Sequence, residues 1–334
     1  MATNKWYLGE GEQSDVVIST RIRLARNIEE YPFPHKLDTK VRIKLNEKIR
    51  DAVCDRENLT FTEMKTLTGS EMISLAEKHI ISPEFASSPD GRALLLSESE
   101  DISIMLMEED HIRLQVMKSG FSLTTAYEIA NRVDNELNEK LKFAFDERLG
   151  YLTVCPTNIG TGMRASVMLH LPALTLCGQM GSLASTVSKL GLTIRGAFGE
   201  GTAPMGELYQ LSNQVTLGIS EKDAIENLKT ITLQLAKEER NARAEIVKNI
   251  ETQDEIFRAY GILKSARLLT TREFLELISK VRLGAVANIL DIKTAVIDEL
   301  MVSLQPASIN ALVGKALDSK DRDIERAKIV RERL

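Results

Sequence analysis

The middle of the sequence contains a glycine turn between two apolar segments, Cys155-Pro-Thr-Asn-Ile-Gly160-Thr-Gly162-Met-Arg164. An alternating stretch at 151–154 precedes it, and no helix breaker follows before Pro172. This pattern predicts a short strand, a turn that uses the conformational freedom of glycine, and then a helix. Because the N-terminus of a helix presents free N–H groups, the turn is a candidate phosphate site. The alternative is an ordinary turn without a ligand.

The charge around this turn favours an anion. No Asp or Glu occurs from position 148 to position 199, although Arg164, Lys189 and Arg195 lie there and the whole chain has a net charge of -5. A dinucleotide-binding motif requires an acidic residue about 20 positions further on, and a Walker motif requires Gly-Lys where Met163-Arg164 stands. The sequence therefore predicts a phosphate-binding turn of neither common kind.

Composition sets the broad class of the protein. The chain has 334 residues, of which 43% are hydrophobic and 27% charged, and its net charge is negative. These values indicate a globular protein and argue against a general nucleic-acid binder. The N-terminus lacks the features of a signal peptide, and no apolar run approaches the roughly 18 residues of a membrane span. We therefore expect a cytoplasmic protein with no membrane or nucleic-acid partner. Three cysteines without C-x-x-C spacing predict neither disulfides nor a zinc site.

Residues 15–27 read as a strand in which Arg21 and Arg23 share one face. Two guanidinium groups side by side repel each other unless an anion lies between them. An anion site and an exposed basic edge strand, which protects against aggregation, are both open interpretations.

A second strand is expected from Glu109 onward, because apolar and polar residues alternate over 112–116. With the apolar residues buried, Glu109, His111 and Arg113 face the opposite way, and Asp110 stays solvated at the start of the strand. This geometry singles out Glu109 among the neighbouring acids. The alternative is a polar turn with a carboxylate and an arginine paired across it.

A glycine-rich segment, Arg195-Gly-Ala-Phe-Gly-Glu200, brings the first carboxylate after the acid-free region. A carboxylate in such a loop, shortly after an arginine, predicts a flap over a substrate, or else a solvated hairpin tip.

Beyond about position 249 the pattern becomes helical, with few strand signals. We therefore expect two domains, 1–248 and 249–334, the second of them all helical.

Together these segments supply candidate residues for phosphoryl transfer: Arg21, Arg23, Arg113, Arg164 and Arg195, the carboxylates Glu109 and Glu200, and Cys155 beside the turn. Arginine forks neutralise the charge of a triphosphate, and catalysis of phosphoryl transfer depends mainly on such positioning and electrostatics. Paired carboxylates suit a guanidinium acceptor, which stays protonated and needs a base at the attacking nitrogen. The residues thus predict ATP and a guanidinium held between two carboxylates.

Four motifs resemble the catalytic domain of phosphagen (guanidino) kinases in order and spacing: Ser19–Arg23, Glu108–Arg113, Cys155–Arg164 and Arg195–Glu200. The resemblance covers roughly residues 14–245. It implies an α+β fold, an antiparallel β-sheet flanked by helices, with ATP as a substrate and Mg²⁺ carried by ATP rather than by protein ligands. It also implies that Glu109, Glu200 and Cys155 contact the guanidinium. For the nucleotide it implies contacts from three runs and two further residues: Ser19, Thr20, Arg21, Ile22 and Arg23; Arg164, Ala165, Ser166, Val167 and Met168; Arg195, Gly196, Ala197, Phe198 and Gly199; and His79 and Arg113.

The chain departs from that family at both ends. Phosphagen kinases of small substrates carry a helical domain before the arginine strand, whereas some fifteen residues precede it here and helices follow the catalytic part instead. These helices end in Arg322-Asp323-Ile-Glu-Arg326-Ala327, which is similar to the motif of a regulatory phosphoarginine pocket in bacterial protein-arginine kinases. Met107 stands where the family usually has Asn before its acidic motif, which bears on the local turn geometry.

The second resemblance implies an activity and its partners. We expect a protein-arginine kinase that marks proteins for degradation by a Clp protease and relieves heat-shock repression. The implied partners are the activator McsA, a CtsR-type repressor, unfolded proteins and further copies of the chain in a dimer or larger assembly. The alternatives are a kinase of a free small guanidine and a non-catalytic adaptor that binds a repressor or chaperone. Retention of both carboxylates and all five arginines counts against the adaptor.

Overall fold

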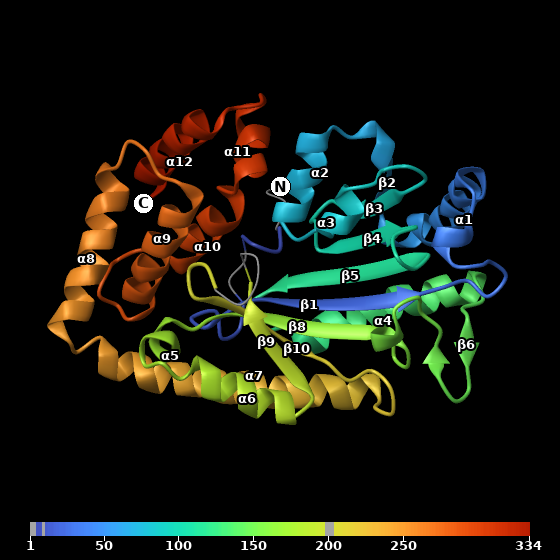
Figure 1. The fold of residues 1–334 in the computed structure, drawn as a ribbon, viewed down its shortest axis with the longest axis horizontal. Helices are drawn as coiled ribbons and strands as arrows, with labels where there is room; N and C mark the ends of the chain where they lie inside the picture. The colour runs from blue at the N-terminus through green and yellow to red at the C-terminus, as the bar shows by residue number, and fades with distance from the viewer. Residues whose placement is uncertain (1–4, 9–10, 198–203) are drawn as a thin grey trace.

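The computed structural model describes residues 5–8, 11–197 and 204–334 (Figure 1). Its centre is an eight-stranded sheet in the order β2-β3-β4-β5-β1-β8-β10-β9, in which all neighbours are antiparallel. The strands are β1 (Val17–Arg26), β2 (Leu59–Glu63), β3 (Ala93–Ser97), β4 (Ile102–Leu106), β5 (Ile112–Ser119), β8 (Met163–His170), β9 (Leu192–Gly196) and β10 (Leu208–Asn213). A separate hairpin joins β6 (Phe145–Asp146) and β7 (Gly150–Tyr151).

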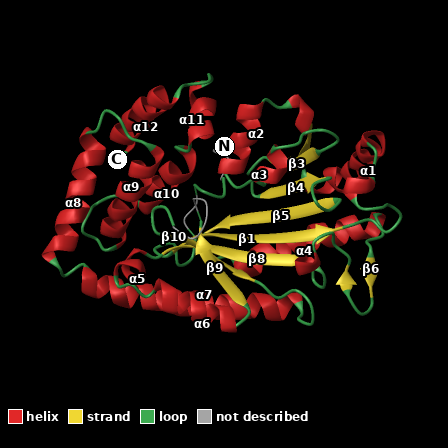
Figure 2. Ribbon diagram, in the orientation of Figure 1, coloured by secondary structure: helices red, strands yellow, loops and turns green. Residues whose placement is uncertain are grey.

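Helices cover one face of this sheet (Figure 2). The three long ones are α1 (Thr39–Glu57), α4 (Leu123–Lys140) and α7 (Glu221–Ile246), and they pack on the sheet through one continuous apolar core. Alternate residues of the central strands, such as Ile22, Leu114 and Val167, supply the sheet side of that core. The shorter helices are α2 (Gly69–Glu77), α3 (Pro83–Ala86), α5 (Pro172–Leu176) and α6 (Met180–Lys189).

The chain ends in five helices, here called the C-terminal helices: α8 (Ile250–Ser265), α9 (Thr271–Val286), α10 (Thr294–Ser303), α11 (Pro306–Val313) and α12 (Ser319–Arg333). They form a second core around Phe274 and Ile278, which Met168 and Leu208 of the sheet also join. α11 packs against α2 (Figure 1). None of the described helices is long and apolar enough to cross a membrane.

The fold class is confirmed, since an antiparallel sheet flanked by helices is followed by helices alone. The helix expected after the glycine turn is wrong, because residues 163–170 form strand β8. β8 pairs with β1 on one side and β10 on the other, and Ala165, Val167 and Leu169 enter the main core at alternate positions. The helix-dipole argument for a phosphate at this turn therefore does not apply. The boundary between 248 and 249 stays a prediction.

Candidate active site

Sheet register brings the predicted arginines onto one face, here called the arginine face. Arg23 of β1 lies opposite Gln115 of β5 and opposite Arg164 of β8. Directly opposite residues of an antiparallel pair share a face. Arg21 and Arg113 share it too, because each lies two residues from one of these positions. The main core occupies the other face, so the expectation that Arg21 and Arg23 project together is confirmed.

Arg195 reaches the same face through the next strand. It lies opposite Gln210 of β10, which in turn lies opposite Met168 of β8, four residues from Arg164. Gln210 also accepts a hydrogen bond at Oε1 from Nη2 of Arg21, at 2.9 Å. The sequence alone did not predict a role for Gln210, because its position beside Arg21 and Arg195 depends on the pairing of strands that lie far apart in the chain.

Burial and mutual repulsion act against the positive charges of this face. Burial, followed by Arg113 and Arg164, lowers the pKa of Arg21 to about 10. The pKa values of Arg23 and Arg164 are also lowered, by burial first and neighbouring arginines second. Their Nε atoms are buried and have no hydrogen-bond partner within the described part of the chain. An anion with several oxygens on this face would supply acceptors and relieve the repulsion.

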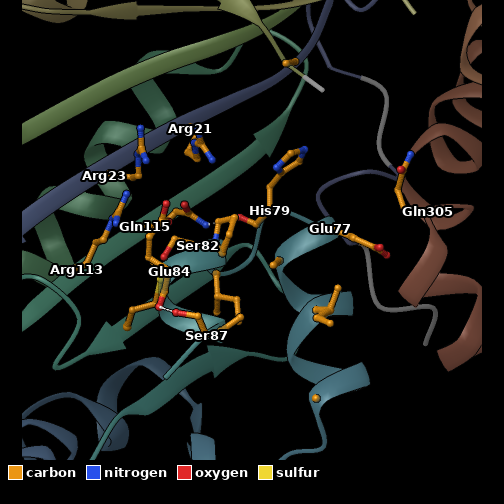
Figure 3. A pocket seen from close by; sticks show the side chains of 18 residues that line it. Arg21, Arg23, Glu77, His79, Ser82, Glu84, Ser87, Arg113, Gln115 and Gln305 are labelled. Atoms are coloured by element: carbon orange, nitrogen blue, oxygen red, sulfur yellow. Dashed lines mark hydrogen bonds between the residues drawn. The ribbon is translucent and has the colours of Figure 1, made fainter. Parts of the chain in front are cut away.

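A cavity of about 880 Å³, here called the larger cavity, lies against the arginine face. Figure 3 shows Arg21, Arg23 and Arg113 at one end of it, with His79 further along. His79 has a φ of 58°, which is uncommon for a residue other than glycine, and its carbonyl oxygen accepts a hydrogen bond from Nε2 of Gln115 at 2.7 Å. Burial and the neighbouring Arg21 and Arg23 lower the pKa of His79 to about 3, so its ring is neutral near pH 7.

The acidic segment before β5 is a turn rather than the start of a strand, because β5 begins only at Ile112. Glu108, and not Glu109, pairs with Arg113 and is also held by the Ser82 hydroxyl. Glu108 is buried whereas Glu109 is exposed, so the turn leaves only Glu109 free to meet a molecule from solution. The anchoring role of Glu108 was not predicted.

Asp110 does not stay solvated as expected; only 3% of it is exposed. Its Oδ1 accepts hydrogen bonds from Nδ2 of Asn27 at 2.6 Å and from the backbone N–H of Val154 at 2.9 Å. Asp110 thus ties the acidic turn to the segment that carries Cys155. His111 was expected on the arginine face, but it is fully buried beneath the 28–32 segment, where its Nδ1 accepts from the Ile28 N–H at 3.0 Å.

Met107, just before the acidic turn, anchors that turn in the main core. Its φ is 63°, in the left-handed region, and its side chain is fully buried in the main core. Asn adopts this conformation more readily than Met does, which accounts for the residue that the resemblance implied here. Met compensates by burying an apolar side chain, and its N–H still donates to the carbonyl of His111 at 3.0 Å.

A smaller cavity of about 230 Å³ borders the larger one, and Arg23 and Arg113 line both. Glu109, Cys155 and Arg164 also line the smaller cavity. Desolvation at the cavity wall raises the pKa of Glu109, and nearby Asp110 raises it further. The smaller cavity therefore combines a carboxylate suited to accept a proton with the cationic groups that serve an anion next to it.

The glycines of the 155–162 turn serve close packing. Gly160 has a φ of 112°, and a Cβ there would overlap the carbonyl group of Thr216. Gly162 has a φ of 60° and lies against the carbonyl of Ala25. The Thr216 hydroxyl also lies 2.8 Å from the carbonyl oxygen of Ile159, to which it can donate. The turn is thereby fixed against β1 and the 216 segment, which sets the position of Cys155.

Several predicted nucleotide residues do not face the larger cavity. Those on the core face of their strands are Thr20, Ile22, Ala165 and Val167. Ser19, Ser166 and Met168 are buried within the sheet and the second core, whereas Ala197 does line the larger cavity. Gly196 ends β9 opposite Tyr209. Phe198, Gly199 and Glu200 lie outside the described residues.

The predicted regulatory motif lies on α12. Arg326 is 1% exposed, and its guanidinium donates to the carbonyl groups of Leu304 and Leu269 and to side-chain oxygens of Asp323 and Thr271. Arg322 donates to the carbonyl of Leu317 at 2.7 Å, and Ala327 is fully buried. In this conformation the motif ties α12 to the start of α9, and a phosphoarginine would have to replace some of these hydrogen bonds.

No group of three or more His, Cys, Asp or Glu residues is arranged to hold a metal ion within residues 5–8, 11–197 and 204–334. Four arginines line the two cavities together with five acidic residues, and the arginines suit the oxygens of a polyphosphate.

Comparison with known proteins shows two matching family models and close full-length relatives. Residues 40–242 match the family model described as ATP:guanido phosphotransferase, C-terminal catalytic domain. Residues 249–334 match the model described as Protein-arginine kinase McsB C-terminal domain. The chain is 45% identical to the protein-arginine kinase of Halothermothrix orenii, covering 98% of this chain and 96% of the relative. It is 42% identical to that of Bacillus subtilis, covering 100% and 94%.

Solved structures agree with the fold. A lombricine kinase matches with a TM-score of 0.63 and 27% identity over 71% of this chain and 69% of that chain. The duplicated taurocyamine kinase of Schistosoma mansoni, solved with transition-state analogue components, matches with a TM-score of 0.61 and 32% identity over 67% of this chain. The match spans 33% of that longer protein. On this evidence the chain belongs to the protein-arginine kinase family of ATP:guanido phosphotransferases.

Proposed function

We propose that this protein transfers the γ-phosphoryl group of ATP to arginine side chains of proteins. The observation that carries the proposal is the junction of the two cavities at Arg23 and Arg113, which line both. A triphosphate on the arginine face would present its γ-phosphate at this junction. A guanidinium in the smaller cavity would then attack from the side of Glu109, which suits in-line displacement.

The chain's own residues supply binding, charge and proton transfer. The arginines offset the charge that develops as the bond between the γ-phosphorus and the bridging oxygen breaks and ADP leaves. A new N–P bond forms as the guanidinium gives up a proton. Glu109, with its raised pKa, and Glu200 hold the acceptor, and one of them takes that proton. Cys155 faces the acceptor from the fixed turn. The neutral His79 ring packs on the nucleobase.

Mg²⁺ would enter with the nucleotide. Its fit rests on the arginines, whose donors would bind some of the phosphate oxygens and leave others to hold the metal. Bound there, Mg²⁺ would withdraw charge from the phosphates. Ser19 and Ser166 complete the nucleotide site as buried residues of the arginine face, next to Arg21, and Gly196 does so at the end of β9.

A protein acceptor fits the exposed side of the smaller cavity, where Glu109, Pro156 and Thr157 reach the surface. The relatives are named for acting on protein arginine, and the C-terminal helices match their C-terminal family model.

We further propose that residues 249–334 form a regulatory domain in which Arg322–Ala327 bind phosphoarginine after local rearrangement. The expected partners are McsA, a CtsR-type repressor and a Clp protease in the cytoplasm, with the chain in a homo-oligomer.

The proposal is tested by incubating the full chain with ATP, Mg²⁺ and either free arginine or a partly unfolded protein, and measuring acid-labile phosphate on each. We expect label on the protein. Glu109→Gln should abolish nearly all of it while ATP binding persists, because an amide neither takes the proton nor balances the guanidinium charge. Glu98→Gln, at an exposed turn between β3 and β4, is the matched control and should retain activity. Label on free arginine alone would contradict the proposal, and label on neither would favour a non-catalytic adaptor.

A further inference from the structure

One wall of the larger cavity comes from the C-terminal helices. Gln305, the residue immediately before α11, lines this cavity together with residues of α2. In Figure 3 it lies on the far side of His79 from Arg21 and Arg23. Since the arginines set the place of the phosphates, the opposite end of the cavity is where a nucleobase would lie. The lining there is mainly apolar, from Ile73 and Ala76 of α2.

The amide of Gln305 has one polar atom available for a ligand. Its Nε2 donates to the carbonyl oxygen of Met301 at 2.8 Å, which closes the end of α10. Its Oε1 accepts no hydrogen bond from a described residue, and it is not one of the buried polar atoms without a partner, so this oxygen is accessible to a ligand. An accessible acceptor on a residue that lines a cavity can accept a hydrogen bond from the molecule that fills the cavity. At the base end of an adenine nucleotide, that donor is the 6-amino group.

A carboxylate from α2 fixes Gln305 in this place. Glu77 accepts hydrogen bonds from the backbone N–H groups of Ala307 and Ser308, at 2.8 and 2.7 Å, and from the Ser308 hydroxyl at 2.9 Å. These N–H groups open α11, so Glu77 caps that helix from a neighbouring element and adds favourable charge at its N-terminus. The cap holds the residue before α11 against the cavity wall formed by α2.

We propose that Gln305 is a specificity-determining residue for the nucleotide, whose Oε1 accepts a hydrogen bond from the 6-amino group of adenine. The inference rests on the proposed function for the position of ATP. It makes the C-terminal helices part of the nucleotide site, so that a change in their packing on α2 alters nucleotide affinity directly.

The test measures equilibrium binding of two nucleotides to the full chain by titration calorimetry. The probes are ATP and purine riboside 5′-triphosphate, which lacks only the 6-amino group. The wild-type chain should bind ATP about five- to twentyfold more tightly than the analogue, the effect of one hydrogen bond inside a cavity. Gln305→Met should weaken ATP binding to the level of the analogue and leave analogue binding unchanged. Gln253→Met removes the same kind of Nε2-to-carbonyl bond on α8 and serves as the control.

Three outcomes would overturn the inference. Equal binding of both nucleotides by the wild-type chain does so without any variant, and therefore does not depend on how well a variant folds. Equal weakening of both nucleotides in Gln305→Met would mean that the residue only shapes the cavity. A preference that follows the ribose hydroxyls, seen with 2′-deoxy-ATP, would assign Oε1 to the sugar. Protein labelling is measured separately, so a chain that discriminates between the nucleotides but labels no arginine contradicts the proposed function alone.

Discussion

Replacing Arg21 by Met should stabilise the ligand-free protein and weaken its complex with ATP. The pKa of Arg21 falls from its ordinary value to about 10 on folding, and each pKa unit corresponds to about 1.4 kcal/mol, so the folded state disfavours its charge by roughly 3 kcal/mol. Met fills similar space without a charge. The variant loses the hydrogen bond to Gln210, which contributes about 1–1.5 kcal/mol. The expected net gain in the free energy of unfolding is therefore about 1–2 kcal/mol.

The direction of the Arg21 pKa shift also determines how the stability of the ligand-free protein depends on pH. Because the folded-state pKa of Arg21 lies below its unfolded value, the cost is fully present below about pH 10 and fades as the pH rises above that towards the ordinary pKa of arginine. Urea unfolding near pH 7.5, with and without saturating ATP and Mg²⁺, separates the two effects. ATP should stabilise the wild-type chain by mass action and the variant much less, since one charge-assisted contact, about 1.5–3 kcal/mol, is gone. Arg267→Met, on an exposed loop, is the control. A less stable ligand-free variant, or one with unchanged ATP affinity, would refute this reasoning.

Three further predictions concern the turns around the smaller cavity. Asp110→Ala removes the acceptor of the buried Asn27 amide and of the half-buried Val154 N–H, and should lower the free energy of unfolding by about 1–3 kcal/mol in urea titrations. A change below about 0.5 kcal/mol would contradict the tie to Val154. Gly160→Ala should lower the melting temperature clearly, because its Cβ meets the Thr216 carbonyl, and an unchanged melting temperature would disprove that close packing. Burial holds the pKa of His111 near 4 against 6.5 when unfolded, so stability should fall as the pH drops from 6.5 towards 4. By pH 5 the loss should be about 2 kcal/mol, and His111→Gln should flatten this dependence.

Local periodicity was enough to predict the face of its own strand on which an arginine lies. β1 alternates apolar and polar residues, so burial of Ile22 necessarily turns Arg21 and Arg23 the other way. The same rule placed Arg113 on the outer face of β5. What periodicity does not contain is which strands are neighbours. The alignment of Arg23 with Arg164 follows from the pairing of β1 with β8, and the sequence alone does not reveal it.

The errors have the same origin. β8 lies between two strands and is buried apart from the half-buried Arg164, and its sequence contains no helix breaker and only weak alternation, which a helix also allows. Asp110 was expected in solvent because its partners, Asn27 and Val154, lie 83 and 44 positions away. In both cases long-range packing decided the outcome, and a local pattern does not record such packing. A role for Gln305 was not predicted for the same reason, because its place at the larger cavity depends on the packing of α11 against α2.

Most arginines of the arginine face have no carboxylate partner among the described residues, and this bears on mechanism. Of the five predicted arginines, Arg113 alone forms a salt bridge among the residues that the structure describes, with Glu108. A protein that needed only stability would pair the others, because buried like charges are costly. Because Arg23 and Arg164 have no anionic partner in the described part of the chain, their repulsion raises the free energy of the ligand-free state. A bound polyphosphate would relieve this repulsion. The transition state, in which further negative charge develops as the terminal bond breaks, would relieve it more. Because no acid occurs from 148 to 199, β8 and β9 add no carboxylate that would neutralise Arg164 or Arg195.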